Sequence, residues 1–261
     1  MPLVTVNYEL EDIAPGGRIG LVALATDYNS ETDLRRILPA GVDMFTNRVL
    51  NANPVTLENL RAMSGDITRA AGGLLPGKGV DVVIFGCTSG TAAIGEDRLA
   101  DLIGATQPGI PCTNPITAAR TAFGALGAKR ISILTPYTEP VNDALADQFR
   151  AAGLEVLNIA GFGMDDDIEM TGLPVSAIVG AALEVRHRQA DALFISCTAI
   201  RAALAVETLE EGLAIPVVTS NQALAWHSLR LMRNTSPVKG FGRLFGLGLG
   251  QNGQPTMADG K

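Results

Sequence analysis

One pattern occurs twice in this chain and limits the folds that it can adopt. Residues 81–90 read DVVIFGCTSG and residues 191–200 read DALFISCTAI, so each copy has an Asp, four mostly apolar residues, a small residue and then Cys-Thr. An Arg-Ile pair opens an apolar run well upstream of each copy, and a tyrosine follows that run. A repeat this long predicts a duplicated half of the chain, because each copy holds several elements and can bury its own core.

Short β-branched runs alternate with segments of helical period, which is typical of an α/β fold with parallel strands. Asn114-Pro115 predicts a helix start and Gly127 a helix end, while Ser30 with Asp33 resembles a capping box. Ligands of open α/β sheets bind at the carboxyl ends of strands. The expected strands are IGLVALA (19–25), VDMFTNRV (42–49), DVVIFG (81–86), ISILT (131–135), LEVLNI (154–159), ALFIS (192–196) and PVVT (216–219).

The repeat predicts two pseudo-symmetric α/β lobes that face each other. We expect the first lobe over residues 18–115, completed by a helix at about 221–235, and the second lobe over residues 116–220. Residues 240–261 are rich in glycine and have neither a helical nor a strand period, so we expect a surface tail there.

Composition excludes several classes of protein. The net charge of −7 argues against binding to nucleic acid or to an anionic membrane surface. No apolar run reaches the ~18 residues of a membrane helix, and the N-terminus does not resemble a signal peptide, so we expect a cytoplasmic protein. Three widely spaced cysteines predict reduced thiols, and two histidines offer little for a zinc site, so we expect no metal.

Cys87 and Cys197 each follow a buried strand and precede a predicted helix. Free backbone N–H groups at such a turn stabilise a thiolate, and Thr88, Ser89 and Thr198 add donors for a carboxylate. Facing turns would place one thiol on either side of a small planar group, so that one removes a proton and the other donates one. Unpaired cysteines are commonly buried for packing alone, but packing does not require Cys-Thr at both repeat positions. Cys112 has no counterpart and is expected to fill the core.

GCTSG with the later SCTAIR, the RIGLVALATD opening, LTPY and PVVTSNQALAW together resemble the aspartate/glutamate racemase superfamily. Within it they are similar to the branch of maleate isomerases, arylmalonate decarboxylases and racemase-like proteins of ectoine-utilisation operons. The resemblance covers about residues 18–235. It implies two flavodoxin-like lobes, an active site at their interface, no cofactor and a homodimer.

The resemblance also implies roles for individual residues. Cys87 and Cys197 match the two catalytic cysteines, and Cys87 disfavours a decarboxylase, which typically has glycine there. Tyr137 matches a substrate-binding tyrosine, and Thr135, which lies beside it, is also expected to bind substrate. Two positions depart from the maleate isomerases, which have Asn where this chain has Asp27 and Asp167.

An ionised Asp accepts hydrogen bonds but cannot donate them. Asp27 and Asp167 would therefore repel a second substrate carboxylate and suit an ammonium group or another N–H donor. Two other interpretations remain open: Asp27 caps the helix that begins near Ser30, and residues 165–167 form a solvated loop.

We therefore expect an isomerase of a small carboxylate that works like a racemase, with a substrate such as an amino acid or an acylated diamino acid from ectoine breakdown. The alternative is a maleate cis-trans isomerase in which Cys87 adds to the double bond. A decarboxylase and a non-catalytic metabolite-binding protein are less favoured. The start of the helix near Ser220 and Asn221 is a further candidate lining of the cleft.

Overall fold

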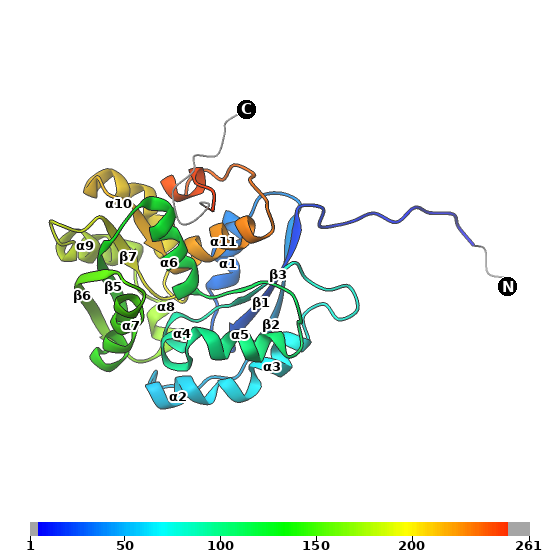
Figure 1. Cartoon of the computed structure of the whole chain (residues 1–261), viewed down its shortest axis with the longest axis horizontal. Helices are drawn as coiled ribbons and strands as arrows, with labels where there is room; N and C mark the ends of the chain where they lie inside the picture. The colour runs from blue at the N-terminus through cyan, green and yellow to red at the C-terminus, as the bar shows by residue number, and fades with distance from the viewer. Residues whose placement is uncertain (1–4, 250–261) are drawn as a thin grey trace.

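The computed structural model describes residues 5–249 and contains two α/β lobes, each built on a four-stranded parallel sheet (Figure 1). The first sheet has the order β2-β1-β3-β4, with β1 (Gly17–Leu24), β2 (Val42–Val49), β3 (Val82–Phe85) and β4 (Cys112–Thr113). The second has the order β6-β5-β7-β8, with β5 (Arg130–Tyr137), β6 (Glu155–Met164), β7 (Ala192–Ile195) and β8 (Val217–Thr219). The predicted two-lobed α/β fold is confirmed.

The aspartate that opens each repeat anchors the first strand of its sheet. Asp81 accepts a hydrogen bond from the Arg18 backbone N–H (2.7 Å), and Asp191 accepts one from the Arg130 N–H (2.9 Å). The Arg130 guanidinium also bonds Asp191 and is the main reason that its pKa falls to about 2. In each repeat the aspartate before β3 or β7 therefore anchors the neighbouring strand, and the Cys-Thr turn follows the other end of β3 or β7.

Helices surround both sheets. The first half of the chain forms α1 (Ser30–Ile37), α2 (Leu57–Ala62), α3 (Ser64–Gly72), α4 (Thr88–Ile94) and α5 (Glu96–Gly104). The chain after β4 forms α6 (Pro115–Leu126), α7 (Glu139–Ala151), α8 (Asp167–Thr171), α9 (Val175–Val185), the 3₁₀ helix η1 (Ala202–Ala205), α10 (Val206–Leu213), α11 (Ser220–Leu231) and η2 (Arg243–Gly246). The predicted ends of α6 are confirmed: the Asn114 side chain accepts from two N–H groups, and Gly127 adopts a φ of 70°.

Two helices cross between the lobes. α6 follows the first sheet, yet its Phe123 packs edge to face against Phe149 and Phe194 of the second lobe. α11 follows the second sheet, is buried along nearly its whole length and packs against α6, α1 and β3. The crossing gives the two lobes a shared core that includes Trp226, and it holds the carboxyl ends of the two sheets in a defined arrangement.

Residues 240–249 differ from the predicted surface tail. Leu244 and Phe245 are buried, and backbone carbonyls of this segment accept hydrogen bonds from Trp226 and Arg230 of α11. A segment without sequence periodicity is thus fixed by side chains that it meets only in the folded chain. The rest of the predicted tail, residues 250–261, lies outside the described residues.

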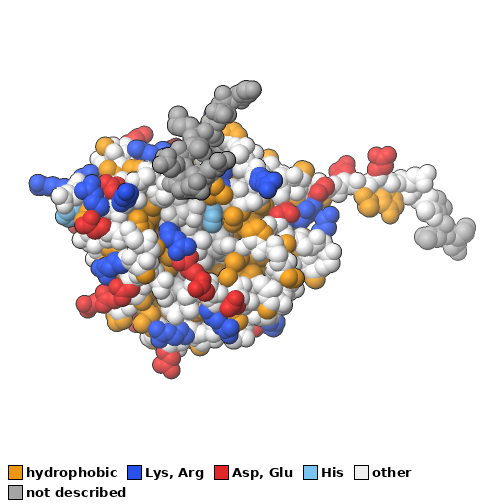
Figure 2. Space-filling view, viewed as in Figure 1, with side chains coloured by type: hydrophobic (Ala, Val, Ile, Leu, Met, Phe, Trp, Pro, Cys, Tyr) orange, Lys and Arg blue, Asp and Glu red, His pale blue; other side chains and the backbone are white. Residues whose placement is uncertain are grey.

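The face in Figure 2 carries basic and acidic side chains interspersed with one another, without a continuous basic area. Residues 5–13 extend away from the body of the protein (Figure 1). None of the helices formed by residues 5–249 has both the length and the apolar character needed to cross a bilayer.

Candidate active site

The Cys-Thr turns after β3 and β7 meet at one cavity between the lobes, which we call the cysteine cavity. It contains both cysteines and both acids singled out in the sequence. The space open to a water molecule is about 10 Å³, enough for about one water. Its lining consists of Leu24, Thr26, Asp27, Cys87, Thr88, Ser89, Tyr137, Asp167, Cys197, Thr198 and Ala199.

Cys87 lies at the N-cap of α4. Its backbone is extended, with a φ of −147°, and its sulfur accepts a hydrogen bond from the Gly90 N–H at 3.1 Å. The Ser89 hydroxyl lies 3.5 Å from the same sulfur. The helix that follows the cysteine therefore supplies the polar groups that hold it, as the sequence predicts.

Cys197 has a different local structure. Its φ is 96°, a left-handed conformation that costs energy in any residue with a side chain. Its sulfur accepts from the Ala199 N–H at 3.3 Å, and no regular helix begins until η1. Unfavourable backbone conformations of this kind persist only where the surroundings impose them.

Both thiols are buried, and their pKa values rise to about 12. Burial is the main cause for each, because a thiolate loses its hydration, and the charge of Asp167 adds to the effect. Hydrogen bonds from Gly90 to Cys87 and from Tyr137 to Cys197 oppose it. The sequence predicts a stabilised thiolate, but in the closed cavity the thiol form prevails, because desolvation outweighs the N–H donors.

The two residues singled out in LTPY have different positions. The Tyr137 hydroxyl reaches the Cys197 sulfur, and burial raises the pKa of Tyr137 well above 10. Thr135 does not line the cavity, contrary to the prediction. Its hydroxyl donates to Asn142 and accepts from the Tyr137 N–H (3.0 Å), so it shapes the turn that carries the tyrosine.

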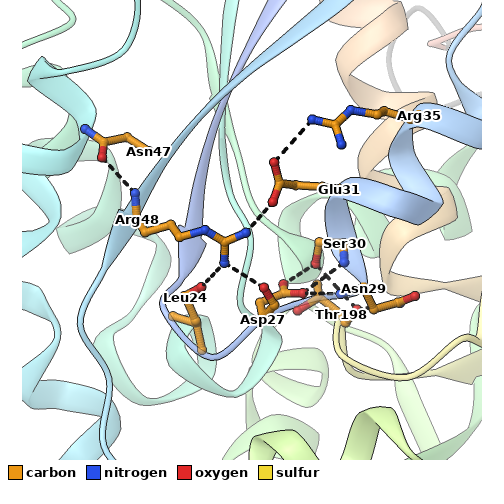
Figure 3. A network of polar contacts seen from close by, with 9 residues as sticks. All are labelled: Leu24, Asp27, Asn29, Ser30, Glu31, Arg35, Asn47, Arg48 and Thr198. Carbon is orange, nitrogen blue, oxygen red and sulfur yellow. Dashed lines mark hydrogen bonds and ion pairs between the residues drawn. The ribbon is translucent and has the colours of Figure 1, made fainter.

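Asp27 lines the cavity but its carboxylate is engaged by its own chain. One oxygen accepts from the N–H groups of Asn29 (2.8 Å) and Ser30 (2.9 Å), and the other bonds the Ser30 hydroxyl. Asp27 therefore caps α1, and the Ser30 and Asp33 capping box that the sequence suggested does not form. Figure 3 shows Arg48 beside this loop, where it donates to the backbone oxygens of Leu24 and Asp27.

Asp167 is the acid that is free to meet a ligand. One of its oxygens accepts from the Thr26 hydroxyl (3.2 Å) and the Asn51 amide (2.8 Å), which belong to the first lobe. Burial is the main cause that raises its pKa to about 6, and the charge of Asp27 contributes. Its neighbour Asp166 instead caps α8, accepting from the Ile168 N–H at 2.8 Å.

Thr26 and Asn51 are absent from the sequence-based site. Thr26 lies directly before Asp27 at the end of the first strand, so its position at a strand end was a usable signal. Asn51 follows β2 and carries no motif; only the meeting of the two lobes brings it to Asp167.

The hydroxyl groups of Thr88 and Thr198 form hydrogen bonds within the protein. Thr198 donates to the Gly86 carbonyl (3.0 Å), which precedes Cys87, and Thr88 pairs with the Ser220 hydroxyl (2.9 Å). Ser220 also accepts from the Cys197 N–H (3.0 Å). Ser220 therefore links the two Cys-Thr turns. Thr88 and Thr198, which the sequence predicts to bind substrate, line the cavity but direct their hydroxyl groups to protein atoms.

The lining of the cysteine cavity has two thiols and two carboxyl groups but no Lys, Arg or His side chain. Within residues 5–249, His, Cys, Asp and Glu do not gather in any group of three or more that could hold a metal ion. The arrangement can exchange protons or form a bond to sulfur, using hydroxyl and N–H groups to bind an anion.

Comparison with known proteins agrees with this geometry. A family model described as arylmalonate decarboxylase matches residues 33–245. The maleate isomerase of Nocardia farcinica is 25% identical over 238 residues, which are 87% of this chain and 94% of the relative. The crystal structure of maleate isomerase from Pseudomonas putida S16 has a TM-score of 0.81 at 24% identity and covers 88% of this chain and 98% of its own.

A second solved structure concerns the chemistry of one relative. It is a cysteine-to-serine mutant of the Nocardia farcinica maleate cis-trans isomerase with a covalently bound succinylcysteine intermediate. Its TM-score is 0.79 at 23% identity, and it covers 88% of this chain and 98% of its own. At these identities the likeness to solved structures establishes the fold that surrounds the two cysteines.

Proposed function

This chain belongs to the arylmalonate decarboxylase family, and from that membership we propose that it is a cofactor-independent isomerase of a small amino carboxylate, in which Cys87 and Cys197 exchange the α-proton. By resemblance, the decarboxylases of the family have glycine where this chain has Cys87, which favours an isomerase. The resemblance to racemase-like proteins of ectoine-utilisation operons makes acylated diamino acids the first substrates to try.

The observation that carries the proposal is the cavity lining, which has two thiols and two carboxyl groups and lacks a cationic side chain. A thiolate in this cavity feels the negative charge of Asp167, and no cationic side chain of the lining stabilises it. A substrate ammonium group would supply that charge and would also donate to the Asp167 oxygen that Thr26 and Asn51 leave free. A dicarboxylate would instead add negative charge to this lining.

In the proposed reaction one cysteine, as thiolate, removes the α-proton and becomes a thiol, while the C–H electron pair moves into an enolate-like carboxylate. The opposite cysteine, as thiol, donates its proton to the other face of the α-carbon and becomes the thiolate. The Tyr137 hydroxyl stabilises the Cys197 thiolate by a hydrogen bond. The two thiols exchange protonation states in each turnover, so the enzyme alternates between a form with the Cys87 thiolate and a form with the Cys197 thiolate.

Solvent deuterium exchange tests this mechanism. In D₂O, proton NMR of each enantiomer of the substrate should show loss of the α-proton and appearance of the other enantiomer with wild-type protein. Cys87→Ser and Cys197→Ser should each lower racemisation by about 10³-fold. Each variant should retain exchange of only one enantiomer, and the two variants should be complementary.

Cys112→Ser is the matched control, because Cys112 lies in β4 and does not line the cavity. It should retain wild-type rates. Full racemisation by both cavity variants, or loss of activity in Cys112→Ser equal to theirs, would exclude the two-thiol mechanism.

Maleate isomerisation is the second candidate, and the pKa of Asp167 favours testing it. With a pKa of about 6, Asp167 is partly protonated in mildly acidic solution and can then donate to a carboxylate. Cys87 would add as thiolate to one alkene carbon while Cys197 protonates the other. The former double bond is then a single bond and can rotate. Return of that proton to Cys197 and expulsion of Cys87 as thiolate would give fumarate. A succinyl adduct on Cys87 in the Cys197→Ser variant, found by mass spectrometry, would establish this route.

The two candidates have opposite pH dependence below neutrality. Amino carboxylate racemisation needs ionised Asp167 and should fall as the pH drops through about 6, whereas maleate isomerisation should rise. Rates measured with both substrates at pH 5 and pH 7.5 therefore distinguish the two candidate functions.

A further inference from the structure

The strained Cys197 turn is held by side chains from outside its own loop. Its φ of 96° is unfavourable, and the bonds to its sulfur from within the loop come from the backbone N–H groups of Ala199 and Ile200. The carbonyl oxygens of Thr198 and Ile200 point instead at two buried asparagines. Asn29 donates to both of them (3.0 and 3.2 Å), and Asn221 donates to the Thr198 oxygen (2.9 Å).

Asp33 joins these two amides. Its Oδ2 accepts from the Asn29 amide (3.0 Å) and from the Asn221 amide (3.0 Å). Asn29 and Asp33 belong to the α1 region of the first lobe, whereas Asn221 belongs to α11. All three side chains are at most 3% exposed. A single carboxylate oxygen therefore orients both amides toward the carbonyls of the Cys197 turn (Figure 3 shows the contact of Asn29 with Thr198).

Two buried oxygen atoms of the Asn29, Asp33 and Asn221 cluster lack hydrogen-bond partners in the part of the chain that the structure describes, which is unfavourable for a purely structural element. Asp33 Oδ1 and Asn221 Oδ1 are buried and have no hydrogen-bond partner within the described residues. Unpartnered buried acceptors lower stability, and a buried carboxylate lowers it further. Burial also raises the pKa of Asp33. An apolar residue at position 33 would avoid these costs but could not orient the two amides.

We propose that Asp33 is a positioning residue that, through Asn29 and Asn221, keeps the Cys197 turn in its left-handed conformation and its sulfur facing the cysteine cavity. The inference rests on the proposed function for its catalytic meaning. The effect of Asp33 on the Cys197 turn can be tested independently of that function, because the accessibility of a thiol can be measured without a substrate.

Asp33→Leu tests the proposal, with Asp33→Asn as the conservative variant that still presents one acceptor oxygen. In Asp33→Leu, alkylation of Cys197 by iodoacetamide, followed by peptide mass spectrometry, should speed up by about tenfold relative to Cys87. Turnover should fall about 10- to 100-fold in kcat with little change in KM, because a displaced catalytic group mainly affects the chemical step. Asp33→Asn should restore most of both properties.

Glu210→Met is the matched control. Glu210 is a buried carboxylate that accepts hydrogen bonds from two backbone N–H groups, those of Val217 (3.1 Å) and Arg243 (2.9 Å), and these bonds do not involve either cysteine turn. It should change stability without changing the ratio of Cys197 to Cys87 labelling. Asn221→Ala removes the hydrogen bond that α11 donates to the Thr198 carbonyl of the same turn. It should reproduce the labelling change if Asp33→Leu does not fold.

The outcomes separate the two proposals. An unchanged labelling ratio in both folded Asp33→Leu and Asn221→Ala would overturn the positioning role, whatever the substrate is. A changed ratio in a protein that turns over no amino carboxylate would support the positioning role and reject the proposed function.

Discussion

The Cys87 turn and the Cys197 turn share a sequence pattern, a strand position and a cavity, yet they are supported differently. Cys87 is extended and is held by Gly90 of the helix that follows it. Cys197 is left-handed and is held by Asn29, Asn221 and Ser220. The duplicated motif thus preserves the position of a thiol but not the contacts that hold it. One thiol depends on local structure and the other on the meeting of the lobes.

The largest effect on stability is expected at Asp167, whose charge raises the pKa of both cysteines. Asp167→Asn keeps an acceptor for Thr26 and Asn51 but removes a carboxyl group whose pKa is raised from 3.8 to about 6. A raised pKa means that the folded state binds the proton more tightly, so wild-type stability declines as the pH rises from about 4 to 6. The variant should therefore be more stable than wild type above pH 6, by up to about 3 kcal/mol, and equal to it below about pH 4.

Urea unfolding at pH 3.5 and pH 8 measures this difference. Asp166→Asn is the control, because Asp166 keeps an equivalent cap on α8 when it becomes Asn. A gain in stability that is the same at both pH values would contradict the assignment of the shifted pKa to Asp167.

Ser220→Ala should break the link between the turns. It leaves the buried Cys197 N–H without its acceptor and removes the partner of Thr88, which should cost about 1–3 kcal/mol. Ser228→Ala is a matched control on the same helix, because the Ser228 hydroxyl is buried and has no hydrogen-bond partner within the described residues. Thermal unfolding of the two variants should differ; equal losses would mean that Ser220 does not act through the turns.

At Cys197 the backbone conformation itself can be tested. Cys197→Gly should be more stable than Cys197→Ala by about 1 kcal/mol, because glycine adopts a φ of 96° without strain. Both variants lack the thiol, so the difference reports the backbone alone. If the alanine variant proves the more stable of the two, the left-handed conformation is not a source of strain.

At Cys87 a smaller difference is expected, and it depends on the chemistry of the side chain. Cys87→Ser retains an acceptor for the Gly90 N–H, while Cys87→Ala loses the helix cap and should be less stable by about 0.5–1 kcal/mol. Chemical denaturation of the pair checks this value. The same exchange at Cys197, which caps no α-helix, should give a smaller difference.

Much of the site could be predicted because it depends on strand ends. Cys87, Cys197, Tyr137 and Asp167 all line one cavity, as expected from turns at the carboxyl edges of two similar sheets. Thr135 lies outside the cavity for a local reason: its side chain bonds Asn142 and the Tyr137 N–H, while the tyrosine two residues later reaches Cys197. Asp27 lines the cavity, but its carboxylate oxygens accept hydrogen bonds from Asn29 and Ser30 at the start of α1.

Local sequence patterns are enough to predict the two parallel sheets, the duplicated order of elements and the location of each thiol at the end of a strand, because periodicity and helix caps act over a few neighbouring residues. The left-handed Cys197, the contact of Asn51 with Asp167, the Asp33 cluster and the packing of residues 240–249 become visible in the folded chain alone. Those features join residues far apart in the chain, and burial sets their energies. Burial in turn depends on how the two lobes meet.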